Sequence, residues 1–197
     1  MDSLIALDAP DDVKRAKVDE LHRRLKAKGR GCGTCQACCT IMRVDMEPVG
    51  PIHKPERTRC GHQCSAGCKI YDTKPESCSV FMCLWLAMEL FEDRMLKEWR
   101  PDRVGAVVDV NEVGTITVHL KHENRWMKQG PLRDMLLWLA QGRSMFDQNV
   151  FVVLDRPSGN HLLFKGNGQT QELIACGVGE DGLKVFRTLT EEEMNER

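Results

Sequence analysis

Apolar residues recur along the chain with two different periods, and the period changes near residue 100. In residues 11–28 the apolar positions have helical spacing, and Gly29 follows as a stop. In residues 79–99 apolar side chains recur every three or four positions until Pro101. This second pattern predicts one helix of about twenty residues. The first half of the chain is therefore predicted to contain these two helices, with the cysteine-rich segments and a loop at residues 47–59 between them.

Beyond residue 100 the pattern changes to short β-branched runs separated by turn residues. Residues 131–142 form the one helical pattern among them, and a single helix between strands favours a mainly antiparallel sheet. We therefore predict an α+β fold. It comprises a helical cysteine-rich metal-binding region at 1–100 and an α+β region at 101–197 that packs on it, or else one single domain. The predicted strands are residues 104–110, 115–120, 150–154, 161–165, 172–176 and 183–189.

The overall charge excludes several classes of partner. The 197 residues carry 28 basic and 29 acidic side chains, a net charge of -1. This balance predicts no nucleic-acid partner and no membrane surface as partner. The longest uncharged apolar run, residues 80–88, is about half of the ~20 residues that span a bilayer. The first residues lack a basic and apolar leader pattern, so we expect a cytoplasmic location.

Nine of the ten cysteines lie between residues 32 and 83. In a reducing compartment such a cluster favours metal binding or catalysis over disulfides, and an odd number argues against a disulfide framework. Most of these cysteines have small or polar neighbours, which argues against a role as buried apolar residues. All nine are candidate metal ligands: Cys32, Cys35, Cys38, Cys39, Cys60, Cys64, Cys68, Cys78 and Cys83.

Their spacing indicates soft-metal chemistry without selecting the metal. Cys32, Cys35 and Cys38 form overlapping C-x2-C pairs, a run that holds iron–sulfur clusters when a remote cysteine completes it. Four thiolates equally suit structural zinc. Sulfur ligation excludes calcium and magnesium as the intended ion. The predicted cofactor is therefore zinc or an iron–sulfur cluster. Its ligands would come from three pieces of chain: residues 32–39, residues 60–68 and the start of the helix predicted at 79–99.

Other candidate residues are weaker. Cys83 lies inside an apolar helical pattern and is alternatively a core residue, whereas Cys176 is expected to be a structural residue of its strand. His53 and His62 lie among the cysteines and are further possible ligands. Two other histidines, at positions 119 and 122, would point to opposite faces of a continuing strand, so we expect no shared metal. Residues 177–182 match G-x-G-x-x-G, but no helix follows, so we expect a hairpin turn.

The cysteine motifs resemble a known family. Residues 32–39 read C-G-T-C-Q-A-C-C, and residues 67–83 read G-C-K-I-Y-D-T-K-P-E-S-C-S-V-F-M-C. Over residues 30–85 the chain resembles the CxxCxxCC cysteine-cluster family, the YkgJ-type zinc- or iron-chelating domain. Lys74 stands where that family usually has arginine, and the pair Cys60 and Cys64 gives one more middle cysteine than expected. The resemblance implies metal chelation without an activity, although some relatives carry the domain in a flagellin lysine methylase with an iron–sulfur cluster.

The predicted function is therefore metal binding, with zinc or an iron–sulfur cluster held by a split set of cysteines. In that reading the C-terminal sheet contacts a protein partner. The alternatives are an iron–sulfur enzyme or electron- or methyl-transfer protein, and a metal chaperone or sensor that releases its ion. The chain contains no G-x-S-x-G, P-loop or H-E-x-x-H motif, so the sequence leaves open whether it is an enzyme.

Overall fold

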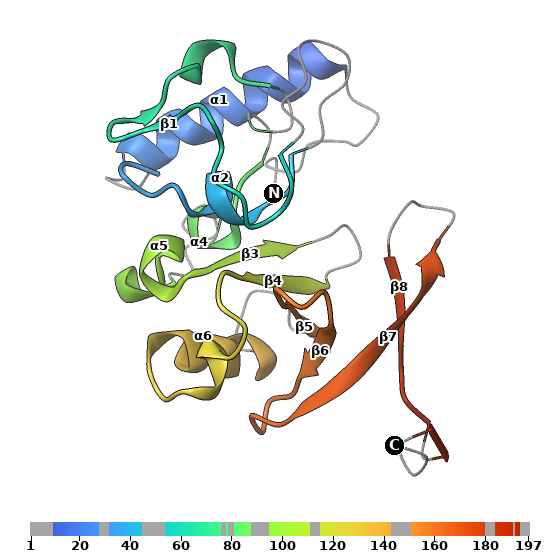
Figure 1. Ribbon diagram of the computed structural model, residues 1–197. Helices are drawn as coiled ribbons and strands as arrows, with labels where there is room; N and C mark the ends of the chain where they lie inside the picture. Colours follow the sequence, from blue (N-terminus) through green and yellow to red (C-terminus); the bar gives the residue numbers. More distant parts are fainter. Residues whose placement is uncertain are drawn as a thin grey trace. The chain divides into compact units, whose positions relative to one another are not determined.

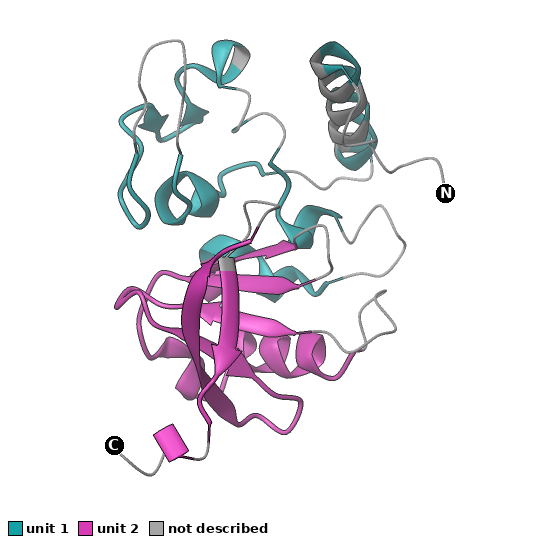
Figure 2. Ribbon diagram, turned by 90° about the vertical axis from the view of Figure 1, so that its right-hand side faces the viewer, with its two compact units in different colours: residues 1–102 teal, residues 103–197 magenta. Residues whose placement is uncertain are grey.

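The computed structural model describes residues 10–27, 32–44, 54–75, 78, 81–87, 95–110, 115–142, 151–179, 184–190 and 192–193. The chain divides into two compact units, Met1–Asp102 (unit 1) and Arg103–Arg197 (unit 2), shown in Figure 2. Each unit is described by itself. No helix within the described ranges has the length and apolar character needed to cross a membrane.

Unit 2 is built on a six-stranded sheet whose strands follow one another in chain order (Figure 1). Every neighbouring pair is antiparallel except β4 and β5, which are parallel. Helix α6 (Pro131–Ala140) lies in the β4–β5 connection, as a parallel pair requires a crossover. The predicted α+β class and the mainly antiparallel sheet are confirmed. The strands are β3 (Ala106–Val110), β4 (Ile116–Leu120), β5 (Val152–Asp155), β6 (His161–Phe164), β7 (Thr170–Val178) and β8 (Lys184–Thr188).

The core of unit 2 lies between this sheet and α6. Along β4 buried and half-buried residues alternate, which is the period of a strand with one apolar face. Phe164 on β6 is 1% exposed and lies edge-on to Trp126 of the 3-10 helix η4 (Arg125–Met127), with ring centroids 6.2 Å apart. Arg133 of α6 covers the same ring. The face of the sheet that carries Phe164 is therefore the face packed against α6.

Strands β7 and β8 form a two-stranded ribbon that extends beyond the rest of the sheet. Strand β7 pairs with β6 only as far as Leu173, and its remaining residues pair with β8 alone. Cys176 lies in that second part and is exposed. It is therefore not a packing residue of the core, contrary to expectation. Strand β7, which ends at Val178, pairs antiparallel with β8, which begins at Lys184, as expected for the two arms of a hairpin. Residues 180–183 of the expected turn lie outside the described part.

Unit 1 consists of short elements after one long helix. Helix α1 (Asp11–Ala27) matches the predicted helix over its described length. The cysteines lie in or beside the elements that follow. These are α2 (Ala37–Ile41), β1 (Gln63–Cys64), β2 (Gly67–Cys68), η1 (Tyr71–Thr73), α4 (Leu84–Ala87), η3 (Lys97–Trp99) and, at the boundary with unit 2, α5 (Pro101–Val104).

The single helix predicted at residues 79–99 is wrong. Residues 81–83 and 95–96 are not helical, and Trp85 Nε1 donates a hydrogen bond of 3.0 Å to the carbonyl oxygen of Leu96. Eleven residues of continuous helix would separate the two by about 16 Å. This contact excludes one straight helix from α4 to η3, and residues 88–94 between them lie outside the described part. The apolar spacing persists because both arms are buried, with Trp85 and Trp99 each 7% exposed.

Candidate metal centre

The first group of cysteines is arranged around a five-residue helix that the sequence did not predict. The amide of Cys35 donates to the carbonyl oxygen of Cys32 at 2.7 Å, closing a tight turn before α2. Gly33 within this turn has φ +49, a conformation that glycine adopts without strain. Cys38 and Cys39 then lie in α2 itself. The motif is therefore a turn followed by one helical turn.

Two glutamines connect α2 to the middle cysteines. Gln36 Nε2 donates to the carbonyl oxygens of Cys64, at 2.5 Å, and Gly67, at 3.3 Å. Gln63, only 8% exposed, donates from Nε2 to Gln36 O and Thr40 Oγ1. These bonds join the hairpin β1–β2 to α2 across about thirty residues of chain. Neither glutamine carried a sequence signal beyond its place next to a cysteine motif.

Residues 54–60 satisfy the carbonyl groups at the end of α2. The amide of Cys60 donates to Cys39 O at 3.3 Å, and the amide of Arg57 donates to Ile41 O at 2.9 Å. The ammonium of Lys54, whose side chain is 3% exposed, donates to Thr40 O and Met42 O. A helix end leaves these carbonyls without intrahelical partners, so the segment supplies the missing donors. Cys60 is thereby held beside Cys39.

Five thiols form a connected set in which each acts electrostatically on at least one other: Cys32, Cys35, Cys38, Cys39 and Cys83. Burial raises the pKa of the Cys32 and Cys35 thiols, and it raises the pKa of Cys83 to about 12. A hydrogen bond between the adjacent side chains lowers the pKa of Cys39 and raises that of Cys38. Within this adjacent pair, the hydrogen bond therefore favours the thiolate form of Cys39 over that of Cys38.

The structure brings the predicted ligands together only in part. Within the described ranges, no three Cys, His, Asp or Glu side chains are grouped so that they could hold one metal ion. Cys64 and Cys68 lie on the β1–β2 hairpin, and Cys78 is exposed. His62 is half-buried and its carbonyl accepts from Lys69 N, whereas His53 lies outside the described residues. The chemistry of the donors fits a soft metal, and the ligand assignment stays a prediction.

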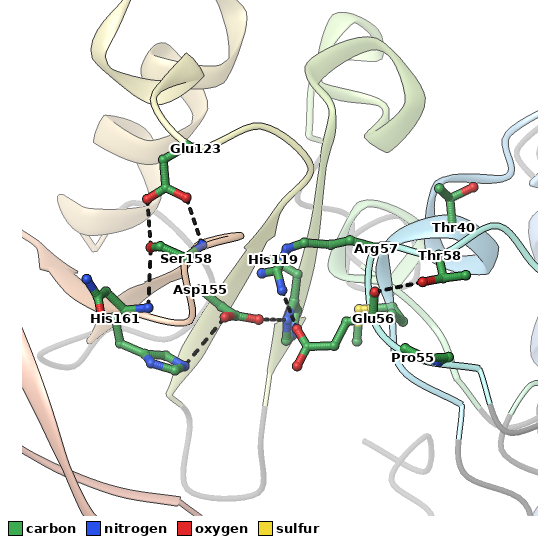
Figure 3. Close-up of polar contacts among 12 residues, drawn as sticks. Thr40, Pro55, Glu56, Arg57, Thr58, His119, Glu123, Asp155, Ser158 and His161 are labelled. Atoms are coloured by element: carbon green, nitrogen blue, oxygen red, sulfur yellow. Dashed lines mark hydrogen bonds and ion pairs between the residues drawn. The ribbon is translucent and has the colours of Figure 1, made fainter.

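A second polar cluster, which sequence reasoning missed, lies on the sheet of unit 2. Asp155 lies between two histidines on neighbouring strands (Figure 3). Its Oδ2 is 2.7 Å from His119 Nδ1, and its Oδ1 is 3.5 Å from His161 Nε2. The three residues are directly opposite one another on β4, β5 and β6, on the face away from α6. The strand register reveals this row, because His119 lies 36 residues before Asp155 in the sequence.

Replacing Asp155 by asparagine should destabilise unit 2. Asp155 is 7% exposed, and its carboxylate is the shared partner of both imidazoles. Loss of a hydrogen bond to a charged group costs about 1.5–3 kcal/mol, which urea denaturation would measure. The matched control is Asp134→Asn on the exposed surface of α6, expected to change the unfolding free energy by less than about 1 kcal/mol. Equal effects of the two substitutions would contradict a structural role for the row.

Comparison of the chain with protein-family models, curated proteins and solved structures found no match. The resemblance to the CxxCxxCC family consequently rests on the residues of the motif alone. The functional proposal is therefore based on the cysteine motif and on the contacts around α2.

Proposed function

We propose that this chain is a cytoplasmic metal-binding protein whose split cysteine set holds zinc or an iron–sulfur cluster. The observation that supports the proposal is a set of five cysteine thiols in unit 1, each of which acts electrostatically on at least one other. Burial disfavours the thiolate forms of these cysteines. Several buried thiolates can therefore exist together only if a cation compensates their negative charge. A thiophilic metal provides that compensation, because thiolates are its preferred ligands.

In this proposal the cysteines of unit 1 are the metal ligands, and two glutamines hold the cysteine segments in place. Cys32, Cys35, Cys38 and Cys39 would supply the first half of the ligands, and the second half would come from the cysteines at positions 60, 64, 68, 78 and 83. Gln36 and Gln63 hold the hairpin against α2, and so limit the movement needed to bring the two halves together. Bound zinc would tie these segments together, whereas an iron–sulfur cluster would add electron-transfer chemistry. The sheet of unit 2 remains as a surface for a protein partner.

Anaerobic purification followed by metal and sulfide analysis tests the proposal. We expect either stoichiometric zinc in a colourless protein, or iron with acid-labile sulfide in a protein that absorbs visible light. The iron–sulfur result would favour the electron- or methyl-transfer alternative over a purely structural centre. A protein that contains neither metal, and takes up neither when supplied with Zn2+ or with Fe2+ and sulfide, would refute metal binding.

A further inference from the structure

The hydrogen bonds between α2 and the β1–β2 hairpin run in both directions. Gln36, at the N-cap of α2, donates from its side chain to main-chain oxygens of the hairpin. Gln63 on β1 donates in return to the main-chain oxygen of Gln36 and to the hydroxyl of Thr40. Each segment thus uses a side chain to bind the other. A shift of one segment along the other would break bonds of both glutamines, so the pairing fixes their relative position.

The side chain of Gln63 is satisfied in this docked arrangement. A side-chain amide has two N–H donors, and Gln63 Nε2 has two acceptors, Gln36 O at 3.1 Å and Thr40 Oγ1 at 3.0 Å. The residue is 8% exposed. Because a buried donor without an acceptor is costly, separating the hairpin from α2 is unfavourable unless water replaces both partners.

The segment that begins at Lys54 is attached to α2 separately. The ammonium of Lys54 donates to main-chain oxygens at the end of α2 and to others in its own segment. Further along the same segment, the amide of Cys60 donates to Cys39 O at 3.3 Å. Two of the cysteine-bearing segments that follow α2 are therefore hydrogen-bonded to it.

All these bonds join amides, carbonyls, a hydroxyl and an ammonium group, so they form independently of what the thiols bind. If a metal alone joined the segments, its binding would have to close long loops, at a cost in chain entropy. Here Gln36 and Cys64, 28 residues apart, are joined by the protein itself. We propose that α2, the hairpin and the segment from Lys54 to Cys60 assemble without metal, and that Gln36 and Gln63 are positioning residues of the metal centre.

This assembly bears on how the metal is bound and released, a consequence that rests on the proposed metal binding. Zinc fingers unfold when their metal is removed, because no other contacts hold their segments. In unit 1 a metal could enter and leave while the segments stay docked. That property suits a chaperone or sensor, which must release its ion, better than a permanent structural centre. Bound metal still stabilises the docked state by mass action, so loss of a ligand remains costly.

Amide hydrogen exchange of the reduced full chain, followed by NMR with EDTA and then with Zn2+, tests the assembly. The amide of Lys69 donates to His62 O across the hairpin at 2.9 Å. A hairpin of two such short strands is not stable alone in water, so protection of this amide reports docking on α2. We expect protection already in EDTA. An amide that exchanges freely in EDTA, and is protected only with Zn2+, would show that metal assembles the segments.

The positioning role is tested with Gln36→Met and Gln63→Met, which remove the donors at similar side-chain length. In EDTA each should lower the protection of the Lys69 amide about 10-fold, and Zn2+ should restore it. The double variant should bind Zn2+ about 10-fold more weakly, because only its docked fraction is competent to bind. Gln141→Met is the matched control. Gln141 donates the same kind of bond to Gly166 O, but in unit 2, so both quantities should stay parental.

Parental protection in both glutamine variants would overturn the positioning role, as would a parental Zn2+ dissociation constant in the double variant or equal losses in the Gln141→Met control. A parent chain that takes up neither Zn2+ nor a cluster built from Fe2+ and sulfide would refute the proposed metal binding instead. The exchange measurement in EDTA would still decide whether the segments assemble by themselves. If one glutamine variant does not fold, the other variant and the parent chain decide the question.

Discussion

Substitution of Cys35 or Cys38 by alanine should remove the bound metal and destabilise unit 1 together. Cys35 lies in the turn before α2 and Cys38 within α2, so both belong to the segment to which the β1–β2 hairpin and residues 54–60 are hydrogen-bonded. Because ligand binding is coupled to folding in small cysteine-rich units, loss of one ligand should cost more than about 3 kcal/mol. Metal analysis and thermal unfolding of the same purified sample would measure both effects.

Cys176→Ala is the matched control for this prediction. Cys176 is a cysteine of the same chain, but it is exposed on β7 in unit 2. Its loss should leave the metal content unchanged and alter stability by less than about 0.5 kcal/mol. Full metal content and an unchanged melting temperature in Cys35→Ala would show that the first cysteine group is not the ligand set.

A comparable loss of stability is expected in unit 2 from Phe164→Ala. The ring of Phe164 is 1% exposed and lies between Trp126 and the guanidinium of Arg133. Truncation removes the buried ring and leaves a cavity, a change that typically costs 3–5 kcal/mol, here about 4 kcal/mol. The metal content of the folded protein should not change, because all nine predicted ligands precede residue 103. Urea denaturation and metal analysis would measure the two quantities.

Phe151→Ala offers the same chemical change at an exposed position. Phe151 precedes β5 and is 57% exposed, so its truncation creates no internal cavity. Its effect should stay below about 0.5 kcal/mol. If both phenylalanine variants lost equal stability, the core would not lie between the sheet and α6 as described.

The sheet of unit 2 was predictable because each strand carries a local signal. The run at residues 115–120, for instance, is rich in β-branched residues and became β4 (Ile116–Leu120). The prediction of one helix at residues 79–99 was wrong because helical spacing of apolar residues does not require a continuous helix. Periodicity indicates which side chains are buried, and two short segments in contact with each other can bury the same positions as one long helix. Helix α2 escaped prediction because five residues are too few to display a period.

In the candidate site too, some residues were recognisable from the sequence and others were not. Cys32, Cys35 and Cys38 were recognisable because their chemistry depends on residue type and spacing, which a sequence displays directly. Lys54 was not, because nothing near it in the sequence marks a lysine for burial. Its burial follows from the free carbonyls at the end of α2, which exist only once that helix has formed. The row at Asp155 likewise depends on strand register, a property of pairing and not of any single strand.

The order of the strands in unit 2 also bears on how that unit folds. Each strand pairs with the next one in the chain, so its contacts join residues that are close in sequence. Loop-closure entropy rises with the length of chain enclosed, and here only the β4–β5 connection encloses a long segment, part of which is the locally stabilised α6. Pairing between consecutive strands keeps the contact order below that of a sheet with a permuted strand order, which favours faster folding. The strands of unit 2 can therefore pair one after another during translation, in the order in which they are synthesised.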